Sequence, residues 1–126
     1  MISADSRQML TLYHFAETAV YEAVENGYYR PSAFSSEGFV HLCKKEQLTG
    51  VYSRYFEGKP NILLLTVRLT ASDPCLIFED STGRGELFPH YYAPIPVASI
   101  QRVSEVETGE QAPEKTDAYF RSLINV

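Results

Sequence analysis

The chain has 126 residues, of which 44% are apolar and 21% charged, and its 16 acidic and 11 basic side chains give a formal net charge of -5. This length and composition fit one folded domain and exclude a disordered or fibrous protein. An acidic chain with no basic run longer than Lys44–Lys45 is also a poor binder of nucleic-acid polymers, because that affinity depends on neutralising phosphates.

The sequence shows no membrane, secretory or disulfide signature. The longest mainly apolar run, Ile62–Val67, is far shorter than the roughly 20 residues of a membrane helix. The start, MISADSRQML, lacks the basic and apolar regions of a secretory signal. Cys43 and Cys75 are too far apart for a CxxC zinc motif and too few for a disulfide framework. We therefore predict a cytoplasmic protein in a reducing compartment.

The first half of the chain alternates strands and helices. Leu10–Ala16 is short, apolar and β-prone, which predicts a buried strand, and Thr18–Asn26 has helical spacing that ends at Gly27. A serine-rich loop follows. We then expect a strand over Gly38–Cys43 and a helix over Lys44–Phe56.

The second half is richer in strands. Ile62–Leu69 is almost continuously apolar, which predicts a central strand covered on both faces. Leu76–Glu79 predicts a short strand before a polar loop, and the proline-rich stretch Leu87–Pro96 an irregular extended segment. Ala98–Val106 alternates apolar and polar residues, as an edge strand does.

This order of elements favours an α+β fold over regular alternation, with a small mixed sheet and two helices. We expect one α+β domain over residues 1–106. Residues 107–126 are expected to form a C-terminal extension, a linker followed by a short amphipathic helix or an ordered tail.

The three histidines are the first candidates for a site. His14, His41 and His90 each lie in an apolar or aromatic stretch, where an imidazole needs polar partners. Each alone is typical of a hydrogen-bonded structural histidine. Together they predict a cleft that holds a phosphate, a ribose hydroxyl or, less favourably, a metal. Since no HxH or HxxxH pair is present, no metal site is predicted.

Other residues could complete such a cleft. Arg30 and Arg54 carry guanidinium groups that suit a phosphate, although each could equally be a solvated surface charge. Tyr13 and Tyr91 flank two of the histidines and are candidate pocket walls. Cys43 is two residues after His41, a spacing that more often places a structural cysteine at a strand end than a nucleophile. Catalytic residues stay undefined.

Several motifs resemble one family in order and spacing: LYHFA, GYYRPSAFSSEGFVHLC, EQLTGVYSRYF, ILLLTVRL and GELFPHYYAPIPVASI. Together they are similar to the bacterial and plant family called domain of unknown function 952, from about Leu12 to Val103. Cys43 stands where that family commonly has a serine, and Ala93 where it has a glycine.

A more distant resemblance connects LYHFA to the first strand of ADP-ribosyltransferases, and GFVHLC with the following helix to RNA 2′-phosphotransferases. It implies a split sheet, a histidine on the ribose of NAD at His14, a second site histidine at His41, and a phosphate-binding arginine at Arg54. The chain differs at Phe15–Ala16, where the pattern has glycine and threonine, and it has no ExE or QxE motif.

Two functions therefore compete. In the first, the protein binds a nucleotide or another phosphorylated small molecule, such as NAD or ADP-ribose, in a cleft lined by the histidines, with ADP-ribosyl- or phosphotransferase-like activity left open. In the second, it is a non-enzymatic binding or interaction domain whose histidines are structural. NAD is the only cofactor implied, and oligomeric state is not predicted.

Overall fold

The most apolar stretch of the sequence forms the central strand of the main sheet. The computed structural model describes residues 8–125, so most of residues 1–9, expected as a polar lead, and Val126 lie outside the described residues. In chain order the elements are β1 (Met9–Glu17), α1 (Thr18–Glu22), β2 (Tyr28–Tyr29), α2 (Phe34–Glu37), β3 (Val40–His41), α3 (Leu48–Tyr55), β4 (Ile62–Thr70), β5 (Leu76–Glu79), β6 (Phe88–Tyr91), β7 (Ile95–Pro96), β8 (Ile100–Glu105) and α4 (Asp117–Ile124), with short 3-10 helices at Lys45–Gln47 and Val97–Ser99.

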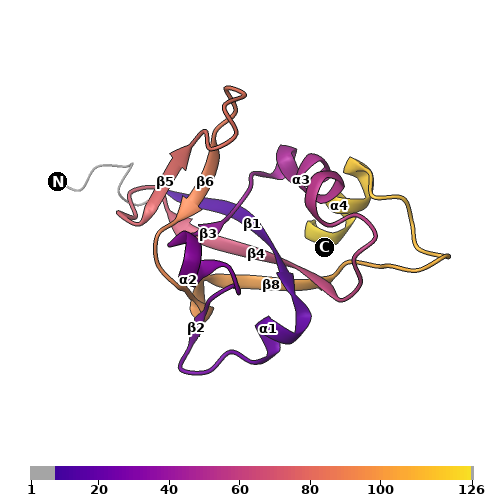
Figure 1. Cartoon of the computed structure of the whole chain (residues 1–126), viewed down its shortest axis with the longest axis horizontal. Coiled ribbons are helices and arrows are strands. Elements are labelled where there is room, and N and C mark those ends of the chain that lie inside the picture. The colour runs from indigo at the N-terminus through magenta and orange to yellow at the C-terminus, as the bar shows by residue number, and fades with distance from the viewer. Residues whose placement is uncertain (1–7, 126) are drawn as a thin grey trace.

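Three antiparallel sheets organise the described chain (Figure 1). The main sheet has the strand order β1-β4-β8. The second sheet has the order β3-β6-β5, and the third consists of β2 paired with β7. β1 and β4 pair over their whole length, from Met9 opposite Thr70 to Glu17 opposite Ile62. The predicted α+β class is confirmed. Its sheets are antiparallel rather than mixed, and it has more helices than the two expected.

Alternation along β1 and β4 gives the main sheet two buried faces. Leu12 and Leu65 belong to one core cluster, which the second and third sheets complete with Val40 and Ile95. Tyr13, Phe15 and Leu64 belong to the other cluster, which α3 and α4 complete with Leu48, Tyr52 and Phe120. The prediction that Ile62–Leu69 is central and covered on both faces is confirmed.

The region between β1 and α3 differs most from expectation. The helix predicted to reach Asn26 ends at Glu22 with Ala23 as its C-cap. Asn26 and Gly27, which both have positive φ, then turn the chain into β2. The expected loop contains β2 and the short helix α2, which ends at Gly38 in the left-handed conformation. Only Val40–His41 of the strand predicted over Gly38–Cys43 pairs in the second sheet.

The later elements follow the prediction more closely. Leu76–Glu79 is a strand with the predicted bounds, and β8 is an edge strand within the expected range. The irregular segment Leu87–Pro96 contains β6, which belongs to the second sheet, and β7, which pairs with β2. No helix within residues 8–125 is long and apolar enough to cross a membrane.

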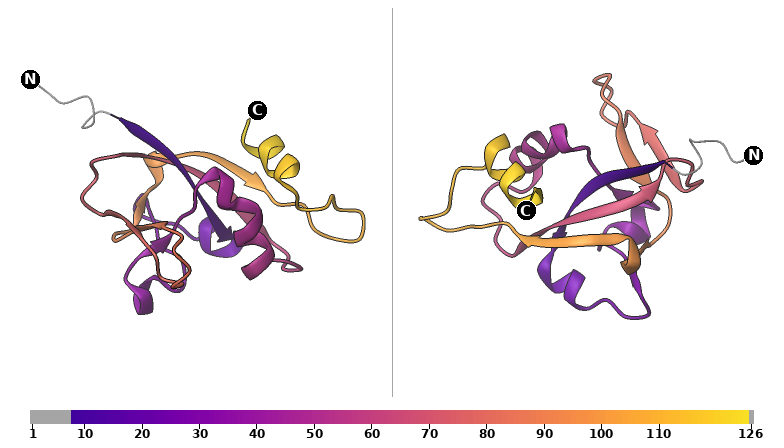
Figure 2. Two further views of the ribbon diagram at one scale, coloured as in Figure 1. Left: turned by 90° about the horizontal axis from the view of Figure 1, so that it is seen from above. Right: turned by 180° about the vertical axis from the view of Figure 1, so that it is seen from behind.

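The C-terminal helix α4 lies beside α3 on one face of the main sheet (Figures 1 and 2). Thr116 caps it by accepting a hydrogen bond from the backbone N–H of Tyr119. Phe120 is 1% exposed, and its ring lies 5.8 Å from that of Phe15 and 5.7 Å from that of Tyr52. The helix also accepts hydrogen bonds at the Leu123 carbonyl from Arg102 and Ser104 of β8. α4 therefore completes the second core cluster.

Replacing Phe120 by alanine should lower the free energy of unfolding by about 3–5 kcal/mol, the usual cost of removing a buried phenylalanine side chain. Urea denaturation followed by circular dichroism measures the change. Leu87→Ala is the control, because Leu87 is 50% exposed and its loss should change stability by less than about 0.5 kcal/mol. Equal stability of the two variants would show that α4 adds nothing to the core.

Candidate functional site

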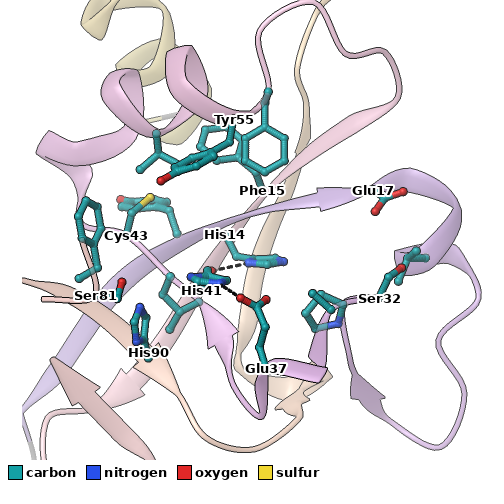
Figure 3. A pocket seen from close by; sticks show the side chains of 18 of the residues that line it. His14, Phe15, Glu17, Ser32, Glu37, His41, Cys43, Tyr55, Ser81 and His90 are labelled. Carbon is teal, nitrogen blue, oxygen red and sulfur yellow. Dashed lines mark hydrogen bonds and ion pairs between the residues drawn. The ribbon is translucent and has the colours of Figure 1, made fainter. Parts of the chain in front are cut away.

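A pocket of about 550 Å³ lies beside β1, and all three histidines line it. It lies where β1 separates from the segment after β3, because these two segments are joined by one bridge between Tyr13 and Cys43. α3 covers one side, the residues before α2 cover another, and the β5–β6 hairpin contributes Ser81 and His90, at the left in Figure 3. We call this site the histidine pocket.

His14 is held in place through both ring nitrogens. Nδ1 lies 2.6 Å from the carbonyl oxygen of His41, to which it must donate, so Nε2 accepts the hydrogen bond from the Tyr29 hydroxyl at 2.8 Å. The side chain is buried, and desolvation lowers its pKa to about 4. His14 is therefore a neutral imidazole that fastens β1 to β3 and β2.

His41 is the exposed histidine of the three. Its Nε2 lies 2.9 Å from the Glu37 carboxylate, four residues earlier, and about half of the side chain is open to solvent. Its ring meets that of His90 edge-on, with 5.2 Å between the centroids, because the two residues are directly paired between β3 and β6. His41 therefore lies at the accessible rim of the pocket (Figure 3).

His90 has one bonded and one unbonded nitrogen. Nδ1 lies 2.8 Å from Glu79 Oε1, and because an ionised carboxylate only accepts, Nδ1 carries the proton. Nε2 is shielded from solvent and has no hydrogen-bond partner among the described residues. The ring is stacked on Phe39 at 4.2 Å, and its distal end points toward the pocket (Figure 3). A buried polar atom without a partner is rare, and the other such side-chain atom among the described residues is Thr66 Oγ1.

Glu79 is a charged partner for this imidazole. The hydroxyl of Tyr92 and the Nδ1–H of His90 both donate to its Oε1, and these bonds lower the pKa of the carboxyl group. In return the carboxylate raises the pKa of the Tyr92 hydroxyl. Glu79 is therefore an ionised acceptor that fixes the tautomer and the orientation of His90.

Tyr13 is among the residues that line the pocket, but it is 6% exposed and belongs to a core cluster. Cys43 also lines the pocket. Burial raises the pKa of its thiol well above the usual range, which leaves it protonated and a poor nucleophile. The structural interpretation of Cys43 therefore agrees with its surroundings.

Arg30, Arg54 and Tyr91 lie outside the residues that line the pocket. Arg30 is exposed on the chain after β2, and Arg54 is exposed on the face of α3 away from buried Tyr52. Tyr91 follows His90 on β6 and therefore points to the opposite face, where its hydroxyl donates to Asp73 at 2.8 Å. The structure does not bring these three residues to the histidines.

The charges in the pocket are few and mainly negative. Among the residues that line it, Glu17 and Glu37 carry carboxylates, and Lys59 is the one lysine or arginine. The rest of the wall is largely aromatic and aliphatic, including Phe15, Tyr55 and Phe88. Within residues 8–125 no group of three or more histidine, cysteine, aspartate or glutamate side chains is arranged to hold a metal ion.

Two residues outside the predicted site residues matter to this geometry. Tyr29 was assigned to a loop, and its role depends on a distant pairing with Ile95. Glu79 is one of the two carboxylates that the sequence places nearest the site, where it could stabilise a cationic centre or act as a base, although such a residue is more often a solvated carboxylate. Its position could have been found by treating LIFE and FPHY as one hairpin, because Ile77 then faces His90, and Glu79, two residues on, shares that face.

These features define an α+β protein with an aromatic, histidine-lined pocket beside the first strand. The family model described as "Protein of unknown function (DUF952)" matches residues 14–103, and the chain belongs to this family. The solved structures include a crystal structure of protein CC0527 from Caulobacter crescentus, with 27% identity and a TM-score of 0.71 over 79% of this chain and 89% of that one. The solution NMR structure of the same protein gives 29% identity and a TM-score of 0.65, over 79% and 86%.

No curated protein matches this chain. The family resemblance noted in the sequence is confirmed. The more distant resemblance to ADP-ribosyltransferases is supported neither by the family match nor by these structures.

The buried, neutral state of His14 predicts a specific pH dependence of stability. Its pKa falls from 6.5 to about 4 on folding, so between these values the unfolded chain binds more protons. The contribution of His14 is therefore fully present above pH 6.5 and is lost as the pH falls toward 4, a change of about 3 kcal/mol. Urea denaturation at a series of pH values measures it.

The variant His14→Gln should lack this part of the acid-induced loss, whatever its absolute stability. His41→Gln is the control, because it removes an exposed imidazole and leaves His14 intact. A pH dependence in His14→Gln as steep as that of the wild type would show that His14 does not become neutral on folding.

Proposed function

We propose that this protein binds a small organic molecule in the histidine pocket. The observation that carries the proposal is the unpartnered Nε2 of His90, which is buried in the wall of a 550 Å³ pocket. This volume is typical of small-molecule sites, which are mostly apolar and contain a few polar groups that orient the ligand. An N–H or O–H of the ligand would donate to Nε2.

The walls favour a planar ligand. Phe15, Tyr55 and Phe88 offer aromatic surfaces from β1, α3 and β6, and an aromatic ring stacks on such surfaces with a gain of about 0.5–1.5 kcal/mol beyond its burial. A nucleobase is a planar aromatic group of this kind, so a ligand that contains a nucleobase is consistent with the proposal.

The charges set a preference among such ligands. A polyphosphate would meet the carboxylates of Glu17 and Glu37 with Lys59 as the one cation of the wall, and like charges brought together cost free energy. We therefore expect a neutral or cationic planar ligand, such as a nucleoside, to bind more tightly than NAD or ADP-ribose.

The contacts of His14 favour the alternative hypothesis, that the histidines are structural, for this one residue. Both of its ring nitrogens are bonded to the protein, so it offers no direct hydrogen bond to a ligand. In this proposal His14 shapes the pocket, His41 lines its rim and His90 contacts the ligand.

Thermal unfolding with adenosine, NAD and ADP-ribose tests the proposal. A ligand present at a hundred times its dissociation constant should stabilise the folded protein by about 2.7 kcal/mol, and adenosine should do so at the lowest concentration. An unchanged melting temperature with all three, at millimolar concentrations, would contradict the proposed function.

The variant Tyr55→Ala should weaken binding about tenfold, since a stacking contact of about 1.4 kcal/mol corresponds to this factor. Tyr28→Ala is a matched control, because both tyrosines are 53% exposed and only Tyr55 lines the pocket. Isothermal titration calorimetry compares the two. Equal affinities would place the ligand elsewhere.

A further inference from the structure

His90 lines the pocket, and its pair with Glu79, which lies outside the lining residues, has the geometry of an oriented base. Glu79 Oε1 and His90 Nδ1 are 2.8 Å apart, so the carboxylate fixes the proton on Nδ1 and the lone pair of the neutral ring is on Nε2. This is the arrangement in which a carboxylate orients an imidazole and stabilises the imidazolium that forms when the ring takes a proton. The binding proposal above uses only the lone pair of Nε2.

The position of the pair in the fold supports such a role. His90 is 1% exposed, packed on Phe39 and directly paired across strands with His41. Its ring therefore has little freedom to turn away from the pocket. Glu79 is held in addition by Tyr92, whose hydroxyl donates to the same oxygen. A general base needs this kind of restraint, because its nitrogen must stay within hydrogen-bond distance of the group whose proton it removes.

The charged and titratable groups around His90 are also suitable. Glu79 faces it from β5, and His41, the ring that meets it from β3, is itself bonded to Glu37. Tyr92 follows the same strand and is bonded to Glu79. The ion-pair partner of His90 is the carboxylate of Glu79, at 2.8 Å from Nδ1. A positive charge on the ring therefore faces a carboxylate.

We propose that His90 is a general base that removes a proton from an O–H or N–H group of the molecule bound in the histidine pocket, with Glu79 as its positioning residue. The proton passes to Nε2, and the electron pair of the broken bond stays on the ligand oxygen or nitrogen, which becomes an anion. The imidazolium is balanced by the Glu79 carboxylate through Nδ1–H. The substrate class is a planar, uncharged molecule with one weakly acidic O–H or N–H.

This inference rests on the proposed function, and para-nitrophenol tests the two separately. The probe is a planar, neutral phenol, and its anion has a visible absorption band that the neutral form lacks. At a pH below that at which the free phenol ionises in water, the probe bound to the wild-type protein should show the band of the anion. Displacement of the probe by excess phenol should remove the band, and calorimetry should measure binding independently of colour.

Two variants examine the roles of the pair. Asn in His90→Asn places an amide near the position of Nδ1, so it can still donate to Glu79 while no atom replaces Nε2. The probe should still bind to this variant, and the band should be lost. Glu79→Gln keeps an acceptor for Nδ1 and removes the charge, so the band should fall at least several-fold while binding is retained. The matched control is Glu105→Gln, an exposed carboxylate on β8 outside the pocket, which should leave the band unchanged.

The outcomes separate the claims. If the probe binds to the wild type without the band of the anion, or if His90→Asn shows the same band, His90 is not the base and the binding proposal stands. An unchanged band in Glu79→Gln overturns the role of Glu79, and this variant keeps the imidazole in place if His90→Asn fails to fold. If the probe does not bind to the wild type, both proposals are contradicted.

Discussion

The nine-residue antiparallel pairing of β1 with β4 determines most of the remaining structure. Each strand contributes alternate side chains to the two faces of the sheet, and both faces are buried under separate core clusters. β4 is hydrogen-bonded along both edges, to β1 on one side and to β8 on the other. β1 is the outer strand of this sheet, so its other edge is free to form the single bridge with Cys43 and to border the histidine pocket. The pocket is thus a consequence of where the main sheet ends.

The three histidines line one pocket, but they differ in burial and in hydrogen-bond partners. His14 faces the side of the sheet that carries the first core cluster, and burial together with two hydrogen bonds keeps it neutral. His41 is paired with a carboxylate in contact with solvent. His90 has burial and a carboxylate together, with one nitrogen left without a partner. Only this combination offers both a fixed tautomer and an unused lone pair, which is why the proposals concern His90.

Much of the fold could be predicted from local pattern, and most of what failed depends on distant contacts. The run Ile62–Leu69 is apolar at every position but Thr66 and Arg68, so its central place follows from composition. The pair Tyr28–Tyr29 has no such pattern, since it is a strand only because Ile95–Pro96 pairs with it. The first helix ends at Glu22, before the turn in which Asn26 has positive φ, and the helical spacing of the sequence up to Asn26 does not reveal that turn.

The candidate site shows the same division. The hypothesis of a shared site rests on three imidazoles in apolar or aromatic stretches, where each needs polar partners, and all three line one pocket. The prediction of Arg30 and Arg54 rests on the chemistry of guanidinium groups alone. Neither residue lines the pocket, because the direction of a side chain depends on its position around a helix or along a loop and not on its chemistry. The contact of Glu79 with His90 does not follow from local pattern: it comes from hairpin register, which pairs Ile77 with His90 and so places Glu79 on the same face. Because this register belongs to the β5–β6 hairpin and not to the main sheet, the contact between Glu79 and His90 is set by two short strands that pair in a separate sheet.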